Sequence, residues 1–192
     1  MPRLSISSLR PTGAALVLSL AALLGGCSSD SATLPDFGQA KTPQVLATID
    51  ATPFAANYQV DLAIGDWYPN EKRMEINALE LKSDNSGRQL SFYMNAFTGP
   101  GTYVIGTASA GGSSAYLIVS PNVLASIEVR QAQDVVYVTQ RANSGTVTVT
   151  SYDATRRWIE GTFTIEAARL DDPTKVVTIT SGSFAGRVAP GT

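Results

Sequence analysis

Acidic side chains are the residues of this sequence most able to do chemistry, because the 192-residue chain contains no histidine. Without histidine, the Ser-His-Asp and Cys-His arrangements are excluded, and the common zinc sites lose their usual ligands. Glu160 and Glu166 share one face of a predicted strand and lie about 20 Å apart at the rise of a strand. This separation exceeds both glycosidase geometries, so we interpret the two carboxylates as part of a solvated sheet face. We therefore predict no catalytic residues.

The sequence also predicts no metal site and no cofactor. Asp171, Asp172 and the Thr174 hydroxyl offer oxygen ligands for calcium, but without EF-hand spacing, and an ordinary Asp-Pro turn is the favoured interpretation. The glycines between Gly106 and Gly112 lack the lysine and the strand–helix context of a phosphate-binding loop. A net charge of −2 without a basic stripe argues against nucleic acid as a partner.

The segment with the best chemistry for binding is Gly65–Arg73, which we predict to be a turn-rich loop. In a loop, Trp67 and Tyr68 would form a flat platform for a sugar ring or an anchor for a protein partner. Neighbouring residues in a strand point to opposite faces, so both rings face outward only in a true loop. The competing interpretation is that Trp67 closes the end of the domain like a lid. We take Trp67 and Tyr68 as candidate binding residues for a protein or glycan partner.

The N-terminal segment has the features of a secretory signal peptide. Met1–Arg10 carries two arginines and no acid, and Ala14–Leu24 is an apolar run too short for a bilayer, which takes about 20 residues. The next residues, Leu24-Gly-Gly-Cys27, resemble the lipobox of bacterial lipoproteins, in which the cysteine thiol receives diacylglycerol. The competing interpretation is an ordinary signal peptide with an incidental cysteine.

The lipobox resemblance implies that residues 1–26 are removed and that Cys27 becomes the lipidated mature N-terminus. Cys27 is the single cysteine of the chain, and several acyl chains would anchor it stably in a membrane. Ser28 stands where an aspartate would imply retention in the inner membrane, so the resemblance implies the outer membrane. Residues 27–43 then predict a lipidated N-terminus with a flexible tether, because they are rich in Ser, Pro, Gly and Asp.

Residues 44–188 predict a single all-β domain, an antiparallel β-sandwich or flattened barrel, followed by a disordered tail over 189–192. Short runs separated by turn signals are typical of these folds. The clearest are Gly145–Tyr152, Trp158–Ala168 and Lys175–Thr180, which predict a C-terminal three-stranded meander with strict alternation. In this meander we expect seven apolar side chains to be buried: Val147, Val149, Ile159, Phe163, Ile165, Val177 and Ile179. Thr148, Thr162 and Glu166 should be more exposed.

Eight further runs predict strands in the first two thirds of the domain. One of them, Ala125–Arg130, has an alternative as a short helical turn after Pro121. The runs are Val45–Asp50, Tyr58–Ile64, Met74–Lys82, Gln89–Asn95, Gly101–Ile105, Ala115–Val119, Ala125–Arg130 and Val135–Gln140.

Three C-terminal segments, Ser144–Asp153, Ile159–Ile165 and Thr178–Phe184, together resemble a family of bacterial lipoproteins of unknown function. Ala47–Ala55 fits the N-terminal strand of that family, with Ala51 where a glycine is usual. The family has no assigned activity, cofactor or catalytic residues. The resemblance therefore implies a lipoprotein with an all-β domain and transfers no site.

These observations favour a membrane-anchored envelope protein with a non-enzymatic binding or assembly domain. Its partners would be the membrane, through the lipid on Cys27, and an envelope protein or glycan. Two alternatives stay open, a purely structural envelope protein and a glycan hydrolase that uses carboxylates alone.

Overall fold

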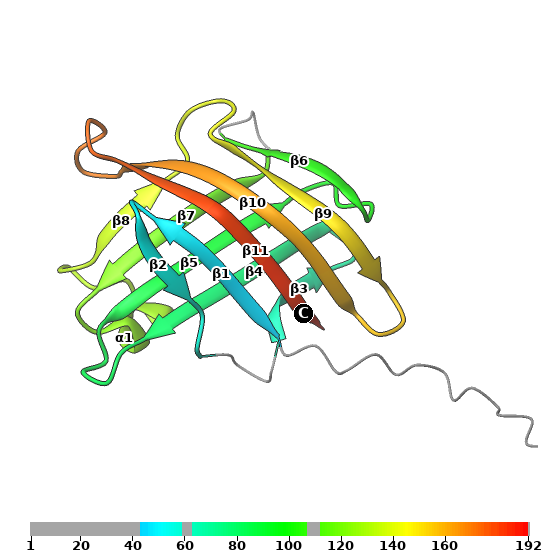
Figure 1. Cartoon of the computed structure of the whole chain (residues 1–192), viewed down its shortest axis with the longest axis horizontal. Helices are drawn as coiled ribbons and strands as arrows, with labels where there is room; N and C mark the ends of the chain where they lie inside the picture. The colour runs from blue at the N-terminus through cyan, green and yellow to red at the C-terminus, as the bar shows by residue number, and fades with distance from the viewer. Residues whose placement is uncertain (1–42, 59–62, 107–111, 192) are drawn as a thin grey trace, which may run out of the picture. The chain divides into compact units, whose positions relative to one another are not determined.

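Alternating apolar and polar residues form strands along most of the domain. The computed structural model describes residues 43–58, 63–106 and 112–191 (Figure 1). Within these ranges it contains one short helix, α1 (Val123–Glu128), and eleven strands. The strands are β1 (Gln44–Ile49), β2 (Thr52–Ala55), β3 (Ala63–Tyr68), β4 (Arg73–Leu81), β5 (Gly87–Met94), β6 (Gly101–Ile105), β7 (Ser114–Ser120), β8 (Val135–Val138), β9 (Gly145–Asp153), β10 (Trp158–Arg169) and β11 (Val176–Pro190).

The strands form one sheet that closes on itself. Its order is β2-β1-β11-β3-β4-β5-β7-β8-β10-β9-β6, and an additional pairing of β10 with β11 closes the strands from β11 to β10 into a ring, from which β1 with β2 and β9 with β6 extend. These two long strands run side by side in Figure 1, where they are orange and red. The closed sheet surrounds one apolar core, which confirms the predicted all-β class.

One pair of strands departs from the antiparallel arrangement that we expected. β11 is longer than β1, so its last residues pair instead with β3, in the parallel direction, from Arg187 with Ala63 to Pro190 with Trp67. β11 therefore includes Ala189 and Pro190, which the sequence analysis placed in a disordered tail. The C-terminus of the domain is a strand that holds β3 in the sheet.

The C-terminal meander is confirmed: β9, β10 and β11 pair in succession and antiparallel. All seven side chains expected inside are buried, whereas Thr162 and Glu166 are exposed and Thr148 is partly exposed. Two cross-strand pairs of phenylalanine and glycine tighten this packing. Phe163 lies over Gly182, and Phe184 lies over Gly161, so closely that a Cβ on either glycine would fall within 2.5 Å of the ring.

The strand predicted over Ala125–Arg130 is wrong, because these residues belong largely to α1, and the alternative of a short helical turn after Pro121 is confirmed. Asn122 caps the helix, its side-chain oxygen accepting a hydrogen bond of 3.4 Å from the backbone N–H of Ala125. The strand predicted over Tyr58–Ile64 also differs: β3 begins at Ala63, Tyr58 forms an isolated bridge with Leu79, and residues 59–62 lie outside the described ranges.

Candidate functional site

Trp67 and Tyr68 lie at the end of β3 and not in a loop as predicted. A turn over residues 69–72 follows them and leads into β4. In the sheet, Trp67 is opposite the fully buried Met74 and packs against the core, whereas Tyr68 is opposite Arg73 on the outer face. Because neighbouring residues of a strand point to opposite faces, the two rings do not form one platform. The position of Trp67 instead agrees with the competing interpretation, in which its ring closes the end of the domain like a lid.

Phe97 is the centre of an aromatic cluster around Trp67. The Phe97 ring, 4% exposed, lies 5.4 Å from Trp67, 5.5 Å from Tyr103 and 5.2 Å from Tyr152, measured between ring centroids. Such edge and stacked contacts add to the free energy of apolar burial. We call these four residues the aromatic end of the strand ring.

The other end of the ring contains an ion pair between Glu80 and Arg88. Glu80 is six residues beyond Met74 on β4, and its side chain faces inward like that of Met74. Arg88 donates from Nε to Oε2 of Glu80 at 2.6 Å and from Nη2 to Oε1 at 2.7 Å. Both side chains are only 15% exposed. This two-point geometry fixes the guanidinium and the carboxylate in one plane.

The ion pair also holds the edge of β2. Arg88 Nη2 donates a hydrogen bond of 2.6 Å to the carbonyl of Pro53, and Glu80 Oε1 accepts one of 3.4 Å from the N–H of Ala55. The guanidinium lies 5.3 Å from the centre of the Phe54 ring. In the described part of the chain, the strand ladder of β2 has β1 on one side only. The two charged side chains therefore satisfy backbone groups that a further strand would otherwise bind.

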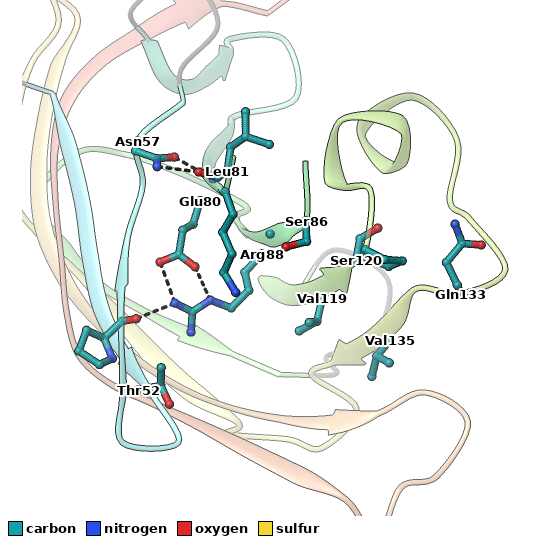
Figure 2. Close-up of a pocket in the computed structure, with 14 residues that line it drawn as sticks. Thr52, Asn57, Glu80, Leu81, Ser86, Arg88, Val119, Ser120, Gln133 and Val135 are labelled. Carbon is teal, nitrogen blue, oxygen red and sulfur yellow. Dashed lines mark hydrogen bonds and ion pairs between the residues drawn. The ribbon is translucent and has the colours of Figure 1, made fainter. Parts of the chain in front are cut away.

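A cavity of about 720 Å³ opens beside this ion pair. Figure 2 shows Glu80 and Arg88 on one side and Val119 and Val135, from β7 and β8, on the other. Backbone and polar groups around Thr52, Asn57 and Gln133 complete the lining. An apolar wall with a few fixed polar groups is typical of small-molecule sites, which measure about 300–1,000 Å³. We call this cavity the end pocket.

The charge of Glu80 is stabilised by its neighbours. Burial opposes ionisation, but the hydrogen bond and the charge of Arg88, with the N–H of Ala55 and the charge of Lys82, outweigh it and lower the pKa of Glu80. At neutral pH the pocket therefore contains a carboxylate that is already ionised and paired.

The other acidic candidates do not line this pocket, and each has a partner of its own. Glu160 accepts a hydrogen bond of 2.8 Å from the Trp158 indole, and Glu166 is 3.9 Å from Arg141. Asp171 binds Arg169, and Asp172 accepts from the Thr174 hydroxyl at 2.6 Å. Across the three described ranges, no group of three acidic or thiol side chains is placed to hold a metal ion. Cys27 lies outside those ranges.

Sequence reasoning missed Glu80 and Arg88, although a signal was present. The predicted strands Met74–Lys82 and Gln89–Asn95 are joined by a short connection, and the register of β4 and β5 places these opposite charges across from each other. Both occupy inward positions in the alternation, where apolar residues are expected. A complementary charge pair at inward positions of a hairpin indicates a buried ion pair.

None of the described helical residues forms a segment with the length and apolarity needed to cross a bilayer. Comparison of the chain with protein-family models, with curated proteins and with solved structures gives no match. The lipoprotein family resemblance therefore stays a prediction from the sequence.

Proposed function

We propose that this protein is a lipid-anchored protein of the bacterial envelope whose all-β domain binds a partner without catalysing a reaction. The anchor is Cys27, within Leu24-Gly-Gly-Cys27, and the tether is the segment up to residue 43. Ser28 favours the outer membrane. The end pocket is the site at which we expect the partner, an envelope protein or a glycan, to be held.

The observation that carries this proposal is the state of the charged groups in the end pocket. A general acid or base needs a pKa near the working pH, whereas Arg88 lowers the pKa of Glu80 away from neutrality. The carboxylate is also occupied by the guanidinium and by the N–H of Ala55. Such a site supports recognition by shape and fixed polar groups better than proton transfer.

The anchor is tested by replacing the single cysteine. Cys27→Ala should abolish incorporation of labelled palmitate and release the protein from the membrane fraction. Ser28→Ala is the matched control, because it leaves the thiol in place and should label like the wild type. Labelling of Cys27→Ala would contradict the lipobox interpretation.

The pocket is tested by photo-crosslinking in the intact, membrane-bound protein. Benzoylphenylalanine in place of Val119 should give a defined adduct, and the same probe in place of Val104 on β6, which is 54% exposed, should not. Val135→Trp fills the pocket and should abolish the Val119 adduct without lowering the melting temperature. If the Val119 adduct persists unchanged in Val135→Trp, the end pocket is not the site, and absence of any adduct favours a purely structural envelope protein.

A further inference from the structure

The outer face of the sheet carries a second concave site, far along β4 from Glu80. Arg73, Glu75, Tyr93, Asn95 and Ser114 line a shallow, open depression of about 450 Å³, which we call the outer groove. The register places Glu75 opposite Tyr93, and Tyr93 opposite Ser114, so the lining forms a row across β4, β5 and β7. It shares no residue with the end pocket.

Arg73 is held rigidly at one end of the outer groove. Its guanidinium lies 4.2 Å from the centre of the Tyr68 ring and 6.0 Å from that of Tyr93, and Nη1 is 2.7 Å from Glu71. Within the described residues, Nε of Arg73 is buried without a hydrogen-bond partner. Desolvating an N–H in this way costs about 1–3 kcal/mol. The fold thus fixes a planar cation at the surface at some expense of stability.

Tyr93 forms the middle of the row as a neutral hydroxyl. Its ring lies 6.0 Å from that of Tyr116. Burial, followed by the hydrogen bond and charge of Tyr116 and by Glu75, raises the pKa of Tyr93 far above its ordinary value. The hydroxyl therefore keeps its proton under all physiological conditions and can both donate and accept.

The remaining polar groups of the outer groove are also oriented. Asn95 Nδ2 donates to the carbonyl of Gly112 at 2.6 Å, which sets the direction of its amide. Glu75 accepts from Asn77 Nδ2 at 3.0 Å. The groove therefore presents fixed donors and acceptors beside the Tyr93 ring, and Arg73 at its end is paired with Glu71.

We propose that the outer groove binds one or two sugar rings of a glycan. Sugar hydroxyls both donate and accept hydrogen bonds, which suits a lining that is almost entirely polar and carries donors and acceptors side by side. The carboxylate of Glu75 would repel a free anion, and the guanidinium of Arg73 would repel a second cation, so a neutral ligand fits best. Tyr68, singled out from the sequence, would then act as a positioning residue that holds Arg73. The inference goes beyond the binding function proposed for the end pocket.

The test uses the full chain in detergent and two glycan sources, purified peptidoglycan sacculi and the oligosaccharide released from lipopolysaccharide. We expect retention by one of them, and the arm that retains the protein identifies the source. Asn95→Ala should weaken binding about tenfold, the effect of one lost hydrogen bond. Tyr58→Phe, a tyrosine outside the groove, is the control and should bind like the wild type.

Two further variants keep this test decisive. Arg73→Lys retains the charge but loses the planar stack on Tyr68, so it should also weaken binding. If Asn95→Ala does not fold, Ser114→Ala removes a hydroxyl from the same row. Retention by neither glycan, or equal affinity of the wild type and the folded groove variants, overturns the proposal. The Val119 crosslink in the end pocket should be unaffected throughout, which separates this outcome from failure of the proposed binding function.

Discussion

The two ends of the strand ring are closed by different chemistry. At one end, the aromatic cluster around Phe97 fills the interior with rings whose centroids are 5.2–5.5 Å apart. At the other, Glu80 and Arg88 stand at inward positions and bind the edge of β2, and a cavity of about 720 Å³ lies beside them. One end of the ring is thus closed by packed aromatic side chains, and the other by a directed ion pair with a pocket beside it.

The difference shows why the end pocket is the better candidate for binding. Aromatic packing gains free energy from burial and loses it if water or a ligand enters. A paired Arg and Glu, in contrast, present planar polar surfaces and can contact a ligand without separating. The stability of the fold should therefore depend most on the aromatic end.

Removing the central ring of the aromatic end should have the largest effect. Phe97→Ala should reduce the free energy of unfolding by about 3–5 kcal/mol, because it deletes a buried ring that three other rings contact. Denaturant unfolding measures this loss. Phe97→Leu is the control and should lose much less. A loss below about 1 kcal/mol for Phe97→Ala would show that the other three rings close this end without Phe97.

Breaking the ion pair should have the next largest effect. Arg88→Met should lower the free energy of unfolding by about 2 kcal/mol, since it leaves the Glu80 carboxylate and the Pro53 carbonyl without their donor. Combining it with Glu80→Gln should recover part of the loss, because the unpaired charge is removed. Equal stabilities of Arg88→Met and the wild type would mean that the Glu80–Arg88 ion pair does not hold β2.

The two neighbouring rings of β3 should differ in their contribution. Tyr68→Ala should lower the free energy of unfolding by about 0.5–1 kcal/mol, the value of an accessible cation–π contact with Arg73. Trp67→Ala should cost several times more, because Trp67 packs against the core. Denaturant unfolding of the two single variants compares them directly. A larger loss for Tyr68→Ala than for Trp67→Ala would reverse the assignment of the two faces.

Acid should destabilise the fold through the Glu80–Arg88 ion pair, and this effect should be the smallest of those predicted. The pKa of Glu80 is lower in the folded chain than its ordinary value of 4.5, so its contribution to stability is complete above pH 4.5 and is lost as the pH falls below it. The free energy of unfolding of Glu80→Gln should therefore change less between pH 6 and pH 3 than that of the wild type. Phe97→Leu should show the pH dependence of the wild type, and parallel curves for all three proteins would contradict the role of Glu80.

Most of the strands could be predicted because alternation is a local property. The β6 boundaries, Gly101–Ile105, and the buried faces of the meander agree with the sequence pattern, since a side chain's face depends only on its place in the strand. Ala125–Arg130 failed because six residues between turn signals do not distinguish a strand from a helical turn. The cap provided by Asn122 favoured the helix.

For the site, the sequence pointed to Trp67 and Tyr68, whereas the end pocket lies at the other end of the strand ring and contains neither residue. The sequence drew attention to Trp67 and Tyr68 and, through alternation, determined that two neighbouring rings in a strand must face apart. This segment is a strand because it pairs with β4 on one side and, on the other, with β11, whose residues lie more than a hundred positions away. Pro190 pairs with Trp67, and the N–H of Gly191 donates to the Trp67 carbonyl at 2.7 Å.

In the end pocket, too, some features follow from the sequence alone and others from the tertiary structure. The sequence predicted most of the strands around this pocket, but it did not identify Glu80 and Arg88 as an inward-facing pair. Only the tertiary structure brought β2 across the ring, so that Arg88 meets the carbonyl of Pro53, 35 residues away. Periodicity is set by covalent neighbours, whereas the partner of a sheet edge is set by which distant segment can satisfy its backbone groups.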